Sequence, residues 1–197
     1  MILADEDALA QWRQALQRRT AAGRKQLLSR AVGLQRHPHL RICDATAGFG
    51  RDAALMAALG ADVTVCERHP DVIAFLQRAI GSLPPALRER LHLFAGDARE
   101  QLQHRQWDAV YLDPMYSPTR KHALPDAQAQ QLRSLVGNDP DADALLPLAR
   151  AAAHRRVVVK RALRAPPLAG LSPMESLRGN SVRFDLYNPI PDVKETS

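Results

Sequence analysis

The stretch that decides the fold is "LRICDATAGFGRDAALMAALG", residues 40–60. It opens with a β-prone apolar run, residues 40–45, and passes through the glycine-containing turn "DATAGFGRD", residues 44–52. It continues as a helix-prone segment that Gly60 is placed to end. A strand, a glycine loop and a helix in this order are typical of the nucleotide-binding crevice of an open α/β sheet.

Downstream of this unit, short β-rich runs alternate with longer amphipathic runs, which is the signature of a parallel sheet with crossover helices. The run 107–113 is apolar on both faces and predicts a central strand, whereas the alternating run 181–187 predicts an edge or antiparallel strand. The other expected strands are 62–67, 91–96 and 155–161. The other expected helices are 70–80, around 126–136 and 141–153, the last two separated by the turn signal "GNDP".

Length and composition place the chain in a broad class. Its 197 residues, 46% hydrophobic and 24% charged, fit one globular domain. Cys43 and Cys66 lie in apolar runs without zinc-like spacing, so we expect buried thiols in a reducing compartment. His37 and His39 flank a proline without a ligand cluster, and no metal site is predicted. Without a secretory leader or an apolar run of about 18 residues, we expect a cytoplasmic protein with no membrane partner.

The positive charge is concentrated near the N-terminus. Residues 1–42 hold eight basic and three acidic residues, which accounts for five of the six net charges. The basic residues Arg18, Arg19, Arg24 and Lys25 lie within one helix-prone segment. Such a segment predicts contacts with nucleic-acid phosphates, and a solvated helix face is the alternative interpretation.

The glycine loop and the acid after the next strand indicate a nucleoside cofactor. Gly48 and Gly50 let the backbone approach a ligand where side chains would clash. Glu67, 17 residues after Gly50, can accept hydrogen bonds from both ribose hydroxyls of an adenosine, a device shared by NAD and S-adenosylmethionine enzymes. The third glycine of a pyrophosphate loop is missing. Asp44 and Asp52 would repel a pyrophosphate but suit a sulfonium and an amino group, so the pattern favours S-adenosylmethionine.

Asp97, in "AGDA" after the expected third strand, has two interpretations. Its carboxylate can accept a hydrogen bond from the adenine amino group, with the backbone N–H of Ala98 donating nearby. Alternatively it caps the helix that starts at Ala98. The sequence leaves both open.

The expected central strand ends in "DPMY", residues 113–116, at the edge where open α/β sheets bind ligands. The Asp113 side chain and the Pro114 carbonyl offer two acceptors in a rigid fork, and proline has no N–H to compete for them. Tyr116 offers a stacking face for an extruded base, worth about 1–3 kcal/mol. These features suit an exocyclic base amine, and the alternative is a plain turn with Tyr116 packed on the core.

Taken in order, "DATAGFGRDA", "CERHP", "VYLDPMY", "RRVVVKR" and "RFDLY" resemble the RsmJ family of S-adenosylmethionine-dependent guanine-N2 methyltransferases of bacterial small-subunit (16S) ribosomal RNA. The resemblance implies a Rossmann-like class I methyltransferase fold. This is an α/β fold with a mostly parallel seven-stranded sheet, an antiparallel C-terminal strand and helices on both faces. We accordingly expect a short basic helical segment at 1–36, the methyltransferase domain at 37–190 and a frayed tail at 191–197.

The resemblance also assigns residues to the site. The family's cofactor contacts fall on Arg51, Asp52, Glu67, Arg68, Asp97, Ala98 and Asp113, beside Asp44, Gly48 and Gly50 of the loop. Asp113, Pro114 and Tyr116 are the expected catalytic residues. The expected RNA-binding residues are Arg18, Arg19, Arg24, Lys25, Arg120, Lys121, Lys160 and Arg161. Lys160 is the foremost of these, because it closes a strand at the same sheet edge as Asp113.

The expected partner is small-subunit ribosomal RNA or the 30S subunit, bound by a monomer. Two alternatives stay open at this level. The acceptor could be an adenine or cytosine amine in DNA, or the chain could be a non-catalytic RNA-binding factor of ribosome assembly. An NAD-dependent oxidoreductase is disfavoured by the glycine pattern.

Overall fold

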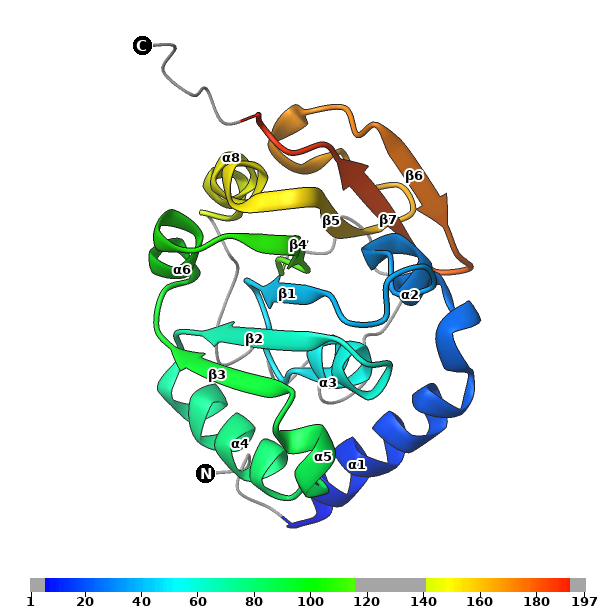
Figure 1. The fold of residues 1–197 in the computed structure, drawn as a ribbon, viewed down its shortest axis with the longest axis vertical. Coiled ribbons are helices and arrows are strands. Elements are labelled where there is room, and N and C mark those ends of the chain that lie inside the picture. Colours follow the sequence, from blue (N-terminus) through cyan, green and yellow to red (C-terminus); the bar gives the residue numbers. More distant parts are fainter. Residues whose placement is uncertain (1–5, 116–140, 192–197) are drawn as a thin grey trace.

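A seven-stranded sheet forms the centre of the molecule in the computed structural model, which describes residues 6–115 and 141–191 (Figure 1). The strand order is β3-β2-β1-β4-β5-β7-β6. The strands are β1 (Arg41–Asp44), β2 (Asp62–Glu67), β3 (Leu91–Ala95), β4 (Trp107–Leu112), β5 (Ala153–Ala162), β6 (Glu175–Arg178) and β7 (Val182–Tyr187). Pairing from β3 to β5 is parallel, whereas β7 is antiparallel to both β5 and β6. The expected fold class is confirmed.

All six strands located from the sequence are present, and β4 is the middle strand of the sheet. The antiparallel direction of β7 is also confirmed, but β6, not β7, forms the edge. The sequence did not reveal the position of β6, because "ESLR" is four residues long and only half-buried. A strand this short and polar carries no alternating apolar pattern.

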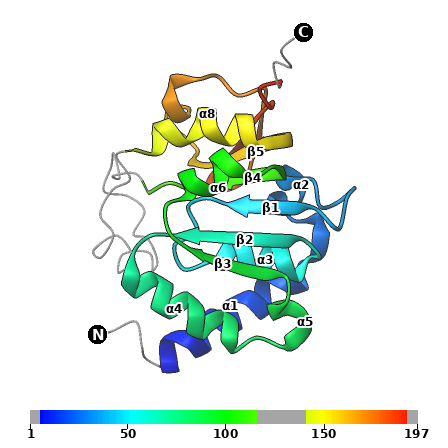
Figure 2. The ribbon, with the colours of Figure 1, turned by 60° about the vertical axis from the view of Figure 1, so that its left-hand side comes forward.

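Helices cover both faces of the sheet (Figures 1 and 2). One face packs against α1 (Glu6–Ala21), α2 (Leu27–Val32), α3 (Arg51–Ala58) and α4 (Pro70–Gly81). The other face packs against α6 (Ala98–His104) and α8 (Ala142–Ala152). The short elements are η2 (Gly23–Lys25), α5 (Pro85–Arg88) and η3 (Leu168–Gly170). Successive strand residues alternate between the two cores, as the period of two requires.

Helix α1 is part of the core, although its sequence is rich in charge. Leu9, Trp12 and Leu16 are buried, and they recur at the spacing of one helix face. The Trp12 indole donates a hydrogen bond of 2.8 Å to the carbonyl of Phe49 in the glycine loop. The basic helix is therefore attached to the loop that the sequence assigns to the cofactor.

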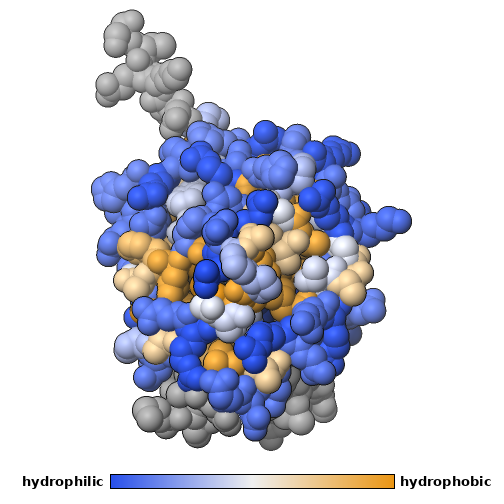
Figure 3. Space-filling view, turned by 60° about the horizontal axis from the view of Figure 1, so that its bottom comes forward, coloured by the Kyte–Doolittle hydropathy of each residue, from blue (hydrophilic) through white to orange (hydrophobic). Residues whose placement is uncertain are grey.

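The two cysteines agree with the sequence-based expectation. Cys43 and Cys66 are buried free thiols with their sulfurs 3.7 Å apart. Within 6–115 and 141–191, no helix is long and apolar enough to cross a membrane, and no group of three or more acidic, histidine or cysteine side chains could hold a metal. Polar side chains surround an apolar area on the face that lies lowest in Figure 1 (Figure 3). The expected helix around 126–136 and the "GNDP" turn lie outside the described residues.

Candidate functional site

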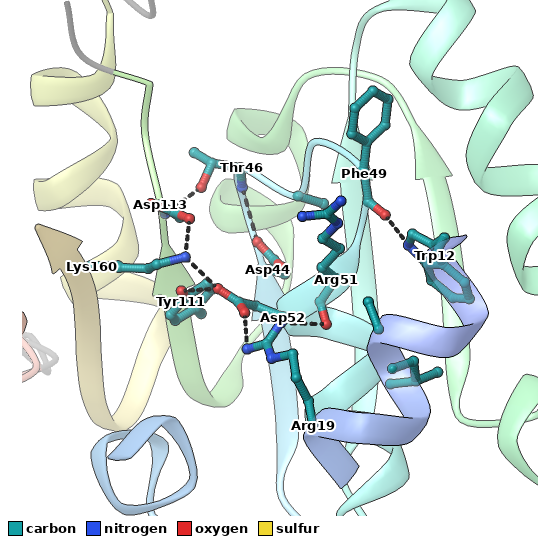
Figure 4. A pocket seen from close by; sticks show the side chains of 13 residues that line it. Trp12, Arg19, Asp44, Thr46, Phe49, Arg51, Asp52, Tyr111, Asp113 and Lys160 are labelled. Carbon is teal, nitrogen blue, oxygen red and sulfur yellow. Dashed lines mark hydrogen bonds and ion pairs between the residues drawn. The ribbon is translucent and has the colours of Figure 1, made fainter. Parts of the chain in front are cut away.

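Four polar side chains converge where β1, β4 and β5 end. Three of them, Asp44, Tyr111 and Lys160, point to the α3 side of the sheet. Each lies two positions after a strand residue whose side chain belongs to the hydrophobic core on that side. Asp113, two residues after Tyr111, continues the series. They open into a pocket of about 360 Å³ that Trp12, Phe49 and the first turn of α3 also line (Figure 4). The predicted site edge thus coincides with a cavity.

Asp52, in the first turn of α3, is the hub of this pocket. Its Oδ2 accepts hydrogen bonds from the Tyr111 hydroxyl at 2.6 Å and from Lys160 Nζ at 2.9 Å. Its Oδ1 accepts from Arg19 at 2.5 Å. Burial acts to raise the pKa of Asp52, but the charges of Lys160 and Arg19 and the tyrosine hydrogen bond outweigh it and hold that pKa far below its usual range. Asp52 is therefore an ionised, fully bonded carboxylate.

The glycine loop is tied directly to the end of β4. Thr46 accepts a hydrogen bond of 2.5 Å from the Asp113 backbone N–H, and its own N–H donates to Asp44 at 3.3 Å. Gly48 and Gly50 both have left-handed backbones, with φ of 52° and 66°. At Gly50 a Cβ would also lie 2.7 Å from the Leu76 side chain, and the positive φ would strain any L side chain, so the position favours glycine.

Glu67 and Asp97 mark the ends of the next two strands. One oxygen of Glu67 accepts the backbone N–H groups of Arg68 and His69, each at 2.8 Å, which orients the carboxylate at the start of α4. Asp97 caps α6 through the Arg99 N–H at 2.9 Å, so the capping interpretation is confirmed. Its contact with adenine stays a prediction.

An ion-pair cluster adjoins Asp97. Arg99 binds the Asp97 carboxylate side-on, with its Nε 3.0 Å from both oxygens, and this arginine lowers the pKa of Asp97. Arg68 and Arg99 both reach Asp141, at 2.8 and 3.3 Å. The sequence did not indicate that Arg99 and Asp141 belong to the site, because only the fold brings them together.

The predicted RNA-binding residues are scattered by the fold. Arg18 and Lys25 are exposed. Arg24 bonds the Leu59 carbonyl at the far end of α3 from Asp52, and Lys25 lies beside it in η2. A helix of eight residues is about 12 Å long, so η2 lies at the edge opposite the pocket.

Besides Arg24, three of the cations predicted to bind RNA have internal partners. Arg19 and Lys160 bind Asp52, and Arg161 is 4% exposed with its guanidinium on the Pro166 carbonyl. The prediction that Arg161 contacts RNA is therefore wrong. A run of basic residues in the sequence does not show which side chains face inward. Arg120, Lys121 and Tyr116 lie outside the described residues.

The residues present fit S-adenosylmethionine. Asp44, Glu67 and Asp97 end or closely follow three adjacent parallel strands, so their carboxylates line one edge of the sheet. Three carboxylates in a row match the donors of the cofactor in order: an ammonium next to a sulfonium, two ribose hydroxyls and an adenine amine.

The protonation of Asp44 makes the stability of the folded protein depend on pH. Burial first, and then the Asp52 charge, raise the pKa of Asp44 well above its usual value. The unfolded chain therefore releases this proton at lower pH than the folded protein does. As pH rises from the pKa of Asp44 in the unfolded chain to its raised pKa in the folded protein, the folded state loses stability. Without cofactor, we expect Asp44→Asn to unfold at a higher Tm than the parent at pH 8, by roughly 2–4 °C per kcal/mol gained.

Thermal unfolding from pH 4 to pH 8 measures the effect. The difference should shrink toward pH 4, where the folded parent keeps its proton. Asp71→Asn, at an exposed position of α4, is the matched control. A Tm difference that is constant over the whole pH range would contradict the assignment.

Comparison with known proteins agrees with this geometry. Residues 8–189 match the family described as "Putative SAM-dependent methyltransferase". The chain is 44% identical over 184 residues to ribosomal RNA small subunit methyltransferase J of Pectobacterium atrosepticum, covering 89% of this chain and 74% of that protein. The same-named protein of Tolumonas auensis is 45% identical over 181 residues, covering 88% and 73%.

A solved structure shows the same relationship. The crystal structure of an S-adenosylmethionine-dependent methyltransferase from Neisseria gonorrhoeae is 35% identical and superposes with a TM-score of 0.69, covering 91% of this chain and 75% of that one. Glycopeptide N-methyltransferase MtfA, solved with S-adenosylmethionine, shares the fold at 19% identity and a TM-score of 0.50. The chain therefore belongs to the S-adenosylmethionine-dependent methyltransferase family that includes ribosomal RNA small subunit methyltransferase J.

Proposed function

We propose that this protein transfers a methyl group from S-adenosylmethionine to the exocyclic N2 amine of a guanine in small-subunit ribosomal RNA. The observation that carries the proposal is the position of Asp113 and Pro114. They follow the central strand, and the Asp113 backbone is bonded to the glycine loop beside Asp44. The names of the relatives favour ribosomal RNA as the substrate.

The chemistry explains why an acceptor pair belongs there. An exocyclic amine delocalises its lone pair into the base and is a poor nucleophile. Two fixed acceptors, the Asp113 carboxylate and the Pro114 carbonyl, hold the N–H groups so that the lone pair points at the incoming carbon. When bound, S-adenosylmethionine supplies an electrophilic methyl group on a sulfonium. Asp113 acts by orienting the amine, and the surplus proton leaves to solvent after transfer.

The cofactor map is part of the proposal. The adenosine half lies along Glu67, Asp97 and Ala98, and the methionine half lies over Gly48 and Gly50. Arg51, Asp52 and Arg68 complete the set, the last at the start of α4 beside Glu67. Buried, oriented carboxylates at strand ends support this path.

Glu67→Gln tests the ribose contact. Hydrogen bonds to a charged acceptor contribute about 1.5–3 kcal/mol, so we expect Kd for S-adenosylhomocysteine to rise roughly 10- to 100-fold. Isothermal titration calorimetry measures it, and Tm shows that the variant folds. Glu89→Gln, an exposed glutamate after α5, is the control. An unchanged Kd for Glu67→Gln would place the ribose elsewhere.

The RNA surface is proposed from charge. Arg18 is exposed on α1, whose buried face lines the pocket, so it is the described cation best placed to meet a phosphate near the site. Arg120 and Lys121, close to Asp113 in sequence, belong to the same proposal. Arg24 and Lys25 would contact RNA only if the substrate extends to the opposite edge.

A transfer assay decides the function. The protein is incubated with labelled S-adenosylmethionine and 30S subunits that lack the modification, alongside naked 16S RNA and DNA duplexes. Nucleoside analysis should show label in one N2-methylguanine of the RNA. Label in adenine or cytosine of DNA would show that the acceptor is a DNA base amine instead of a guanine of ribosomal RNA. RNA binding without cofactor affinity would make the protein a non-catalytic assembly factor.

A further inference from the structure

We propose that Lys160 is a positioning residue for methyl transfer, which bridges Asp113 to Asp52 and thereby holds the Asp113 carboxylate as an oriented acceptor for the target amine. The inference rests on the proposed function. It replaces the expectation that Lys160 contacts RNA, since its ammonium points into the pocket (Figure 4).

The bridge joins segments that are far apart in sequence. Lys160 Nζ lies 2.7 Å from Asp113 Oδ2 and 2.9 Å from Asp52 Oδ2. Asp52 is itself immobilised by the Tyr111 hydroxyl at 2.6 Å and by Arg19 at 2.5 Å. The Asp113 side chain is therefore linked through one ammonium to an anchored carboxylate on α3.

The position of Lys160 in the sheet makes the bridge rigid. It lies within β5, two residues after the fully buried Val158, and pairs with Phe184 of β7. Its backbone is thus fixed in an inner strand, and two ion pairs hold its end. The lysine side chain is 26% exposed, which leaves little of it to meet a phosphate.

Charge balance explains why a cation is needed. Asp44, Asp52 and Asp113 surround the pocket, and adjacent carboxylates oppose one another's ionisation. Burial acts to lower the pKa of Lys160, but Asp113 and Asp52 outweigh it and raise that pKa above its usual value, so the ammonium persists. Tyr111, Arg19 and Arg51 are the other ionisable groups of the pocket. Lys160 contacts both Asp52 and Asp113.

The bridge predicts which kinetic constant changes when Lys160 is replaced. A tilted or protonated Asp113 would no longer accept from the amine, so kcat should fall while cofactor affinity changes little. Displacing a reacting group by about 1 Å can cost about 100-fold in rate. An RNA contact would behave differently, because its loss raises KM for RNA and leaves kcat unchanged.

The experiment compares Lys160→Met, which keeps length without charge, with Lys160→Arg and with the control Arg88→Met at an exposed position of α5. Under the conditions of the transfer assay, Lys160→Met should lose about 100-fold in kcat, with Kd for S-adenosylhomocysteine within about threefold. In the pH profile of kcat, the acidic limb of Lys160→Met should move to higher pH. Lys160→Arg should recover part of the rate. Arg88→Met should match the parent.

A second measurement needs no substrate. Carboxyl ¹³C NMR of the pocket aspartates should show titration at higher pH in Lys160→Met than in the parent, as expected when a cation is removed. Unchanged titration would overturn the bridge, and so would an unchanged kcat or a rise confined to KM for RNA. Failure of the parent to methylate RNA would instead overturn the proposed function, and the NMR result would still decide the role of Lys160.

Discussion

Asp113→Ala should lose about 100- to 1000-fold in kcat, the range expected when one preorganised hydrogen-bonding group is removed from a transition-state site. The reason is geometric. Asp113 follows β4, its N–H is bonded to Thr46, and its carboxylate is held by Lys160 at 2.7 Å. Alanine removes the acceptor without disturbing the strand, so the amine loses its orientation. Single-turnover transfer to unmodified 30S subunits measures the rate of the chemical step.

Asp113→Asn is the matched variant, since its amide oxygen can still accept one hydrogen bond while the charge is lost. We expect its rate to fall between those of the parent and Asp113→Ala. Kd for S-adenosylhomocysteine should change much less than kcat in both variants. If Asp113→Ala kept a rate within about tenfold of the parent, Asp113 would not be the amine acceptor.

Asp185→Ala should lower the free energy of unfolding by about 3–5 kcal/mol, because it leaves a buried arginine without its counter-charge. Asp185 is fully buried and accepts from Arg183 at 2.8 and 2.9 Å. The same arginine donates to the carbonyls of Ala162, Leu163 and Ala165. The pair therefore fixes the chain that leaves β5 after Ala162, two residues past Lys160. Urea denaturation measures the loss.

Asp62→Ala supplies the control, since its pair with His92 is half exposed on both sides and such pairs contribute at most about 1 kcal/mol. The double variant Arg183→Met/Asp185→Leu should recover part of the loss, because an apolar pair leaves no buried charge. A loss below about 1 kcal/mol for Asp185→Ala would mean that water reaches Arg183 in the folded protein.

Most of the sheet follows from local pattern. Strand and helix periods differ, so "DVTVCE" and the helix from Pro70 can be located without tertiary information. The edge strand β6 cannot, because its short half-buried sequence carries no period. The role of α1 could not be predicted either. Its charges suggested a solvated or RNA-binding face, whereas Trp12 and Arg19 bind the glycine loop and Asp52.

By itself, the sequence determined six of the seven strands, the glycine loop, and the carboxylates that end successive strands. These depend on side-chain period and turn chemistry within about ten residues, which the chain carries locally. Only the tertiary structure decided the partners of the charges. Lys160 lies 108 residues from Asp52 and 47 from Asp113, and no local pattern encodes a contact at such separations. Sheet pairing places the Lys160 side chain on the pocket side, between the carboxylates of Asp52 and Asp113, where its positive charge stabilises both negative charges.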